Sequence, residues 1–333
     1  MTLALPLCRM LSNMIDTPGY DSFPAGLEGP LLTVRPRPVT RRSFGTGLLI
    51  ALVTARLPAQ KKPERIVSTA PSITETLFAL GLGSQVVGVS QFCDFPPEVR
   101  KLPKVGTYLR PDPEAIARLT PDLVILEKNS NELTDRLHAL HISFVEVPHE
   151  TLNDVFSTIE IIGKAAGISE RSMKLTSEIK CSLDAIRAKA RALPSPRVLI
   201  IVDRRQGTLS NLIAVGPDNY ENQLLTIAGG SNVLAKADVP EYPRISLETV
   251  IRENPDFIID LSSSQRSEEE NPSAGAAILS LWNQQTELAA VRDRHVYAGT
   301  SNALVVPGPR AAKAVQQLFS YIHSGETFTG ARY

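Results

Sequence analysis

The chain has 333 residues, of which 43% are hydrophobic and 21% charged, a balance typical of a globular protein long enough for two compact lobes. Its 35 basic and 35 acidic residues give a formal net charge of +0, and only 5% of its residues are aromatic. This composition favours neither binding to an anionic membrane surface nor the charge attraction and ring stacking on which nucleic-acid binding depends.

The first 60 residues are predicted to be a leader and signal peptide. Two arginines within residues 40–44 precede an apolar run over 45–55 and a small-residue end at 57–60, the layout of a secretory signal. The arginine pair beside Ser43 and Phe44 resembles the twin-arginine export signal. The apolar run is shorter than the roughly 20 residues of a bilayer span. We therefore expect export to the periplasm, with a buried core helix as the alternative.

From residue 61 to 168, short apolar strands alternate with helices, which predicts a first α/β lobe with a mainly parallel sheet. The expected strands are 66–68, 86–89, 123–126 and 144–147, and the expected helices are 72–80, 113–119 and 132–140. Residues 169–193 give the longest helical pattern, which prolines 194 and 196 end. A helix of this length can join two lobes rigidly.

The alternation resumes over residues 194–333, which we assign to a second α/β lobe. Strands are expected at 197–202 and 257–260, and helices at 220–228, 249–252 and 311–322. The three cysteines, Cys8, Cys93 and Cys181, are too few and too scattered for a zinc site or a disulfide framework. Cys93 and Cys181 could pair or could both be free thiols.

One motif occurs twice, as Glu-x-(Ile/Val)-x-Arg-x-x-Pro-Asp-x-(Val/Ile)-Ile. The first copy begins at Glu114 and the second at Glu248, and every position of the second lies 134 residues after its counterpart. A constant offset indicates two lobes of like topology. In each copy the proline ends a short helix and the aspartate starts a buried strand. The helix dipole alone favours a glutamate in the first turn by up to about 1 kcal/mol, but two equivalent acidic positions also suggest a docking surface.

These motifs resemble those of the periplasmic binding proteins whose lobes are joined by one long helix, and most closely the cobalamin-binding proteins of ABC importers. The similarity extends over residues 65–323 and includes segments 66–75, 87–97 and 222–230, and the Pro309-Arg310 pair before the last helix. It implies two Rossmann-like lobes with mainly parallel sheets, a ligand cleft between them, and no catalytic activity or metal site of the protein's own.

The resemblance also implies roles for individual residues. Glu114 and Glu248 occupy the positions of the two lobe-surface glutamates that pair with arginines of the membrane permease dimer, whose ATPase subunits drive import. Phe92, Tyr108 and Tyr242 fall where the family places aromatic rings against the corrin, and Asn302 falls in the last cleft loop. The protein is expected to act as a monomer and to bind a small metal chelate, with cobalamin as the first choice and no cofactor besides.

Glu127 departs from the family, because the cobalamin binder has a tryptophan there. A carboxylate suits the amide side groups of a corrinoid or a polar siderophore better than ring stacking does. Arg110, Arg204 and Arg205 could instead meet the carboxylates of haem or of a siderophore. A ferric siderophore or haem is therefore the alternative ligand.

Functions of other classes receive less support from the sequence. Cys93 with His149, or Ser72 with an acid, could form a nucleophilic pair, but no third group is spaced to orient either. His138 and His141 could touch one metal ion, although two ligands are too few to hold it. A sensor module of the same fold is a further alternative.

Overall fold

The computed structural model describes residues 62–128, 131–262, 274–299 and 302–323. The predicted leader and signal peptide lie outside the described residues. Those from Lys62 onward belong to one compact unit. None of the helices within the described residues is both long and apolar enough to cross a membrane.

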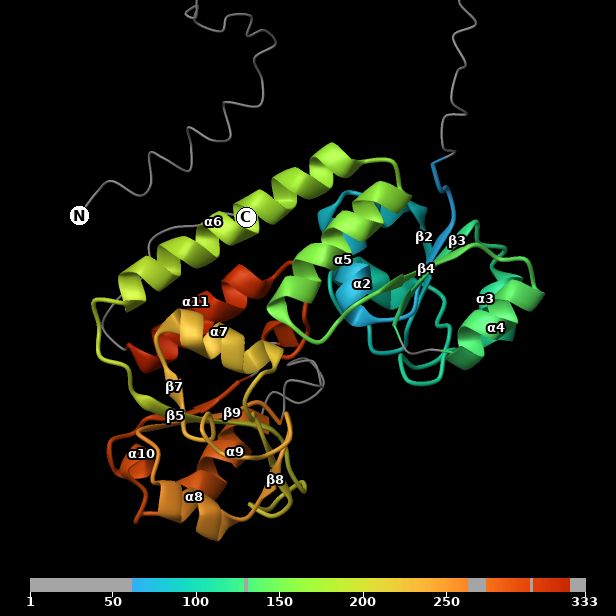
Figure 1. Ribbon diagram of the computed structural model, residues 1–333. Helices are drawn as coiled ribbons and strands as arrows, with labels where there is room; N and C mark the ends of the chain where they lie inside the picture. The colour runs from blue at the N-terminus through green and yellow to red at the C-terminus, as the bar shows by residue number, and fades with distance from the viewer. Residues whose placement is uncertain (1–61, 129–130, 263–273, 300–301, 324–333) are drawn as a thin grey trace, which may run out of the picture. The chain divides into compact units, whose positions relative to one another are not determined.

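The first lobe is built on a four-stranded, fully parallel sheet in the order β2-β1-β3-β4 (Figure 1). Its strands are β1 (Ile66–Ser68), β2 (Val86–Val89), β3 (Leu123–Glu127) and β4 (Phe144–Val147). Its helices are α2 (Pro71–Ala79), α3 (Pro113–Arg118), α4 (Asn131–Ala139) and α5 (Leu152–Ala165). Each strand predicted from the sequence for this lobe is present, in agreement with the expected α/β alternation.

The second lobe is built on a six-stranded sheet in the order β10-β9-β5-β6-β8, with β7 also paired to β5. The pairs that β5 and β10 make with β9, and β5 with β7, are parallel, whereas β6 runs antiparallel to β5 and to β8. The strands are β5 (Arg197–Asp203), β6 (Leu212–Ala214), β7 (Ser231–Asn232), β8 (Arg244–Ile245), β9 (Phe257–Asp260) and β10 (Val296–Ala298). The helices are α7 (Tyr220–Ala228), α8 (Leu247–Glu253), α9 (Ala274–Trp282), α10 (Ala289–Arg292) and α11 (Ala311–Ile322).

The buried side chains form three apolar clusters, one of which runs through both lobes. Val67 and Val124 face a cluster beneath α3 and α4, and Leu199 and Ile201 face a cluster beneath α8, α9 and α10. The neighbouring strand residues point to the opposite faces, where those of both sheets join a single core with α2, α5, α6, α7 and α11. The protein therefore has the predicted two-lobed α/β fold, and its lobes share their largest core.

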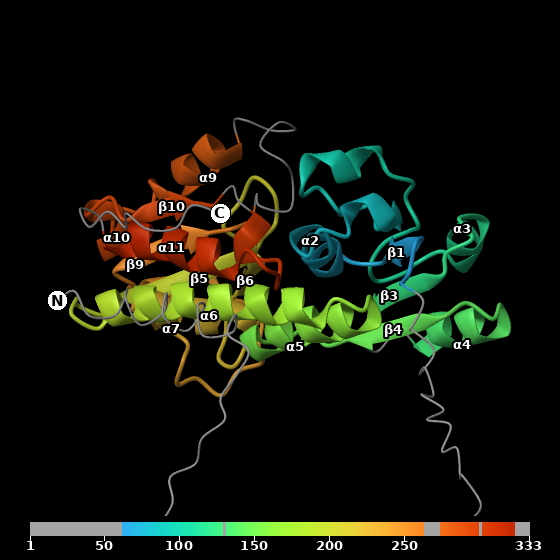
Figure 2. The ribbon, with the colours of Figure 1, turned by 90° about the horizontal axis from the view of Figure 1, so that it is seen from above.

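Helix α6 (Ser169–Ala190) links the two lobes and packs against α5, α7 and α11 (Figures 1 and 2). Its 22 residues span about 33 Å at the usual helical rise. The buried residues Ile179, Leu183 and Ile186 on one face place it in the shared core. The helix ends three residues before the predicted end at 193, where the segment leading to Pro194 begins. The predicted lobe boundaries, 61–168 and 194–333, stay a prediction.

Helix α5 was not among the elements predicted from the sequence, although its start has a clear signal. The side chain of Thr151 accepts a hydrogen bond from the backbone N–H of Asp154, whose carboxylate accepts one from the N–H of Thr151, which is a capping box. Apolar residues then recur with helical spacing at Val155, Ile159 and Ile162. This helix is the crossover that leads from the first sheet to α6.

A test of the α5–α6 contact is provided by Gly163, because a Cβ there would overlap both Oγ and Cβ of the buried Ser172. We expect Gly163→Ala to lower the free energy of unfolding by about 1–2 kcal/mol, since the overlap outweighs the helical gain of alanine over glycine. Denaturant unfolding followed by circular dichroism measures this loss. Adding Ser172→Gly should restore most of it, and Glu160→Ala on the exposed face of α5 is the control. A stabilised Gly163→Ala protein would contradict this packing.

Candidate functional site

The parallel strands gather polar and aromatic residues at the carboxyl edge of each sheet. In the first lobe Glu127 ends β3, while Phe92 and His149 follow β2 and β4 by a few residues. In the second lobe Arg204 follows β5 and Asn302 follows β10. Such edges are where ligands bind in open α/β folds, so these residues form the candidate site.

Phe92 and Tyr108 form an aromatic pair with large exposed surfaces. Their ring centroids are 5.7 Å apart in an edge-to-face arrangement, and the residues are 45% and 43% exposed. Tyr108 lies in a turn in which the backbone N–H of Arg110 donates to Thr107 Oγ1 at 2.8 Å, and Arg110 itself is exposed. The structure thus brings together two of the predicted ligand-binding rings, with apolar area in contact with water.

Glu127 lies partly buried at the end of β3, with its side chain 17% exposed. Its Oε1 accepts a hydrogen bond from Ser72 Oγ at 3.1 Å, and its Oε2 lies 4.0 Å from His149 Nε2. Burial raises the pKa of the Glu127 carboxyl, while the nearby His149 and the bond from Ser72 oppose the rise. The carboxyl group is therefore a strong hydrogen-bond acceptor in a partly desolvated position.

Tyr242 has an exposed ring, but its hydroxyl is bound by the protein. Its residue is 43% exposed, but its OH donates to Glu221 Oε2 at 2.8 Å. Glu221 is buried, and desolvation raises the pKa of both its carboxyl and the Tyr242 phenol. The Tyr242 phenol is thus held in its neutral form, with its proton directed to the protein.

Asn302 is held by an arginine that reaches into the other lobe. Arg310, just before α11, donates from Nη2 to Asn302 Oδ1 at 2.8 Å and from Nε to Glu75 Oε2 at 2.7 Å. A second bond from Nη2 to Glu75 Oε1 makes the ion pair bidentate. Because Glu75 belongs to α2, this pair joins the carboxyl edges of the two sheets.

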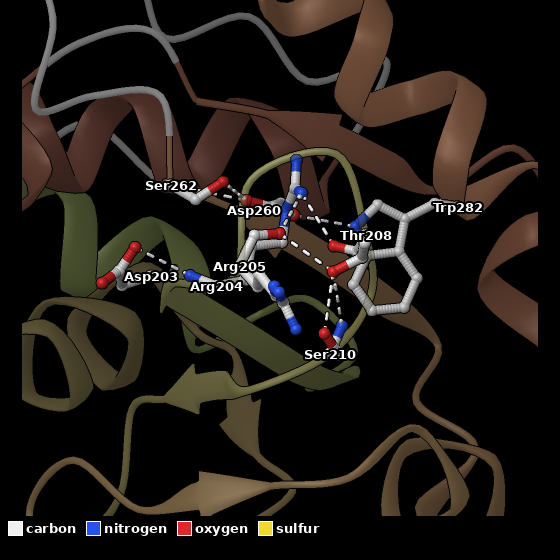
Figure 3. A network of polar contacts seen from close by, with 8 residues as sticks. All are labelled: Asp203, Arg204, Arg205, Thr208, Ser210, Asp260, Ser262 and Trp282. Carbon is white, nitrogen blue, oxygen red and sulfur yellow. Dashed lines mark hydrogen bonds and ion pairs between the residues drawn. The ribbon is translucent and has the colours of Figure 1, made fainter.

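Arg204 was considered as a partner for a ligand carboxylate. In the structure it is instead part of a buried network (Figure 3). Its Nε donates to Asp260 Oδ2 at 3.0 Å, and the two side chains are 6% and 0% exposed. Trp282 Nε1 donates to the same oxygen at 2.9 Å, and Ser262 donates to Oδ1. The charge of Arg204 is therefore neutralised within the protein, whereas Arg205 is exposed.

The residues considered for catalysis do not form a nucleophile-base pair. Cys93 is a buried free thiol, and burial raises its pKa to about 11, so it is not poised as a thiolate. Ser72 donates to a carboxylate rather than to an imidazole, which is not the order of a serine triad. His138 packs edge-to-face on Phe144. Within the described residues, no three His, Cys, Asp or Glu side chains are arranged to hold a metal ion.

The two motif helices are anchored in the same way. Asp122 accepts a hydrogen bond from the N–H of Arg65, and Asp256 accepts one from the N–H of Arg197. In each lobe that arginine also donates to carbonyls at the end of the motif helix, those of Leu119 and Thr120 just after α3, and those of Glu253, the last residue of α8, and Asn254, which follows it. Thr120 and Asn254 have φ of 44° and 41°. The predicted repeat is thus present as repeated geometry.

Glu114 and Glu248 both lie exposed in the first turns of these helices. The N-cap residues are Asp112 and Ser246, whose side chains accept from the backbone N–H three residues on. A bond from Ser246 holds the pKa of the Glu248 carboxyl below its usual range. The two glutamates are therefore presented to solvent by equivalent, capped helices.

The predicted ligand-binding residues did not include the side chains that hold Glu127, Tyr242 and Asn302 in place. These supporting residues are Ser72, Glu75, His149, Glu221 and Arg310. Glu75 and Arg310 lie in segments that carry the family resemblance, and this resemblance was the one sequence signal that could have identified them. Their pairing across 235 residues has no local sequence signature.

Comparison with known proteins places these features in context. Residues 66–303 match the family described as "Periplasmic binding protein". The vitamin B12-binding protein of Vibrio cholerae serotype O1 is 28% identical over 273 residues, covering 81% of this chain and 93% of that protein. The ABC transporter substrate-binding lipoprotein YvrC of Bacillus subtilis is 28% identical over 272 residues, covering 79% of this chain and 81% of its own.

Two solved structures show the same fold at similar identity. The apo periplasmic haem-binding protein RhuT of Roseiflexus sp. RS-1 has a TM-score of 0.68 and 28% identity, over 78% of this chain and 98% of its own. The vitamin B12-binding protein BtuF of Vibrio cholerae has a TM-score of 0.65 and 27% identity, over 79% and 97%.

The Asp260 network provides a test of the second lobe. We expect Asp260→Ala to lower the free energy of unfolding by about 3–5 kcal/mol, because it leaves a buried arginine without its counter-charge. Urea unfolding followed by circular dichroism measures the change. Asp238→Ala, which removes an exposed carboxylate from the same lobe, is the control and should change stability by less than about 0.5 kcal/mol. A loss below about 1 kcal/mol for Asp260→Ala would contradict the assigned role of this pair.

Proposed function

The chain belongs to the periplasmic binding protein family, and on that premise we propose that it captures a corrinoid such as cobalamin and delivers it to an ABC importer. The observation that carries this proposal is the exposed aromatic pair, Phe92 and Tyr108, at the carboxyl edge of the first sheet. Flat rings bury large apolar faces against a macrocycle. Relatives named vitamin B12-binding proteins, aligned over most of both chains, support the same ligand.

The polar residues of the site support an amide-bearing ligand. Glu127 offers a desolvated hydrogen-bond acceptor, and Asn302 offers an amide. A primary carboxamide both donates and accepts, so the corrinoid periphery can use both groups, whereas a ligand carboxylate has no hydrogen to donate to Glu127. Tyr242 would add a ring from the second lobe while its OH stays bonded to Glu221.

The alternative ligand is haem or a ferric siderophore. The likeness to the haem-binding protein RhuT, at 28% identity, favours haem. Arg110 and Arg205 are exposed and could meet carboxylates, but Arg204 is already neutralised by Asp260. Iron ligation by Tyr242 would need a phenolate, which its bond to Glu221 and its raised pKa disfavour.

The partner that we propose is an ABC importer, with a permease dimer and ATPase subunits. Glu114 and Glu248 would each meet an arginine of one permease subunit, since they are exposed on equivalent helices of the two lobes. A relative named as an ABC transporter substrate-binding lipoprotein supports this partner. We further propose that the protein is a monomer without enzymatic activity, exported by a twin-arginine signal and organised as lobes 61–168 and 194–333 around helix 169–193.

The ligand is tested by titrating the purified protein with cyanocobalamin, haemin and ferric siderophores, followed by calorimetry and by protein fluorescence. We expect saturable 1:1 binding of cyanocobalamin, weakened about tenfold or more by Phe92→Ala because a buried aromatic face is lost. Leu140→Ala, which truncates an exposed apolar residue of the same lobe, is the control. Saturable binding of haemin or a siderophore without cyanocobalamin binding would reject the corrinoid.

The docking role is tested by Glu114→Ala with Glu248→Ala. We expect an unchanged Kd for the ligand and a loss of uptake of about 100-fold or more, because two charge-assisted contacts disappear. Ligand uptake into proteoliposomes that contain the importer measures this effect. Glu132→Ala with Glu287→Ala removes the same charge from exposed positions in the two lobes and should leave uptake unchanged. Weaker ligand binding by the first double variant would place these glutamates in the ligand site instead.

A further inference from the structure

Arg310 makes contacts that go beyond an ion pair. Its guanidinium binds Glu75 through two donors, and the same Nη2 donates to Asn302. One face of the guanidinium lies over the ring of Phe95, with Cζ 4.3 Å from the centroid. Phe95 belongs to the same loop as Phe92. A single side chain therefore contacts α2, the loop after β2 and the loop after β10.

This cluster is buried, so its geometry is strongly constrained. The side chains of Arg310 and Glu75 are 13% and 2% exposed. Gly308 passes close to the same carboxylate, since a Cβ there would lie 3.3 Å from Glu75 Oε2. A buried charge pair tolerates little displacement, because each partner would be left desolvated without compensation.

The contact with Arg310 fixes which way the Asn302 amide points. A guanidinium only donates, so the atom of Asn302 that it binds must be the carbonyl Oδ1. The Nδ2 group is then turned away from Arg310, and it has no acceptor within the part of the chain that the structure describes. Asn302 is only partly buried, so its two N–H donors can be reached by solvent or by a bound molecule.

We propose that Arg310 is a positioning residue of the ligand site, which holds Asn302 so that its NH2 group donates to a carbonyl or carboxylate oxygen of the ligand. The proposal rests on the proposed function, since it assigns Asn302 to the same site. In the first lobe Ser72, one turn before Glu75 on α2, donates to Glu127. The ligand is thus offered a donor from one lobe and an acceptor from the other, both supported by α2.

A double-mutant cycle separates positioning from a purely structural role. Affinity for cyanocobalamin is measured by calorimetry for the wild type, Arg310→Gln, Asn302→Ala and the double variant. We expect each single change to weaken binding about three- to tenfold, the effect of one hydrogen bond, and the double variant to be no weaker than Asn302→Ala. Losses that multiply in the double variant, or an Arg310→Gln protein that binds like the wild type, would overturn the proposal.

Two further variants complete the test: one removes the effect of an unpaired buried charge, and the other removes the NH2 group alone. Arg310→Gln leaves Glu75 buried without its charge partner, so the cycle is repeated in a Glu75→Gln background, where no uncompensated charge remains. Asn302→Asp keeps an acceptor for Arg310 but removes the NH2 group, and it should weaken binding at least as much as Asn302→Ala. Affinity equal to that of the wild type in Asn302→Asp would show that the NH2 group is not used.

The failure of this proposal can be told apart from a failure of the corrinoid assignment. If the wild type binds haemin and not cyanocobalamin, the cycle is measured with haemin, whose propionates also accept hydrogen bonds. Coupling between Arg310 and Asn302 with haemin would support the positioning role while rejecting the corrinoid. If the losses of affinity from the Arg310 and Asn302 changes multiply, with whichever of the two probes binds, the positioning role is rejected.

Discussion

The ion pair between Glu75 and Arg310 is the interaction on which the arrangement of the two lobes depends most directly. Glu75 is almost fully buried, and burial raises its pKa against the opposing effect of Arg310. Removing one partner of such a pair typically costs about 3–5 kcal/mol, because the other charge is then buried alone. The apolar core that runs from α2 and α5 through α6 to α7 and α11 acts in the same direction. Large separations of the lobes would break both, so ligand entry is expected to involve small movements.

The parallel order of the strands explains why residues far apart in sequence meet at this pair. Parallel strands place their carboxyl ends at one edge of the sheet. Glu127 ends β3 there, and the segments that follow β2 and β10 carry Phe92 and Asn302. Arg310 then ties the second edge to α2, which starts directly after β1. The site therefore uses strand ends and the loops that follow them, and its polar groups Glu127 and Asn302 are held by neighbouring side chains. Such preorganisation reduces the ordering cost of binding.

The sequence was sufficient where the signal is local or repeated. The predicted strands and helices follow from apolar periodicity and from Pro and Gly at the ends, whereas β6, β7, β8, β10, α9 and α10 of the second lobe were not predicted. The 134-residue offset predicted two like lobes, and the two motif copies share one anchoring geometry. It was insufficient where a side chain's role depends on a distant partner. Arg204 was considered as a ligand-binding residue because no nearby sequence pattern indicates its contact with Asp260, which also binds Trp282. The bond from the Tyr242 hydroxyl to Glu221 likewise joins residues 21 positions apart, and no local pattern indicates it. The helix α5 is the exception, since its capping box was present and overlooked.

The repeated motif can now be divided into residues that build the fold and residues that do not. Its aspartates, Asp122 and Asp256, accept from the backbone N–H of Arg65, just before β1, and of Arg197, the first residue of β5. Its prolines follow the left-handed residues at the end of each helix. Its Ile and Val positions, such as Ile116 and Val250, are buried. The glutamates are the members whose contacts are confined to their own exposed first turn, where Ser246 and the backbone stabilise Glu248. A helix dipole favours an acidic residue there by at most about 1 kcal/mol, and aspartate would serve equally well. Stability alone therefore does not select glutamate at both positions, whereas the proposed docking to a partner with two matching basic groups uses both.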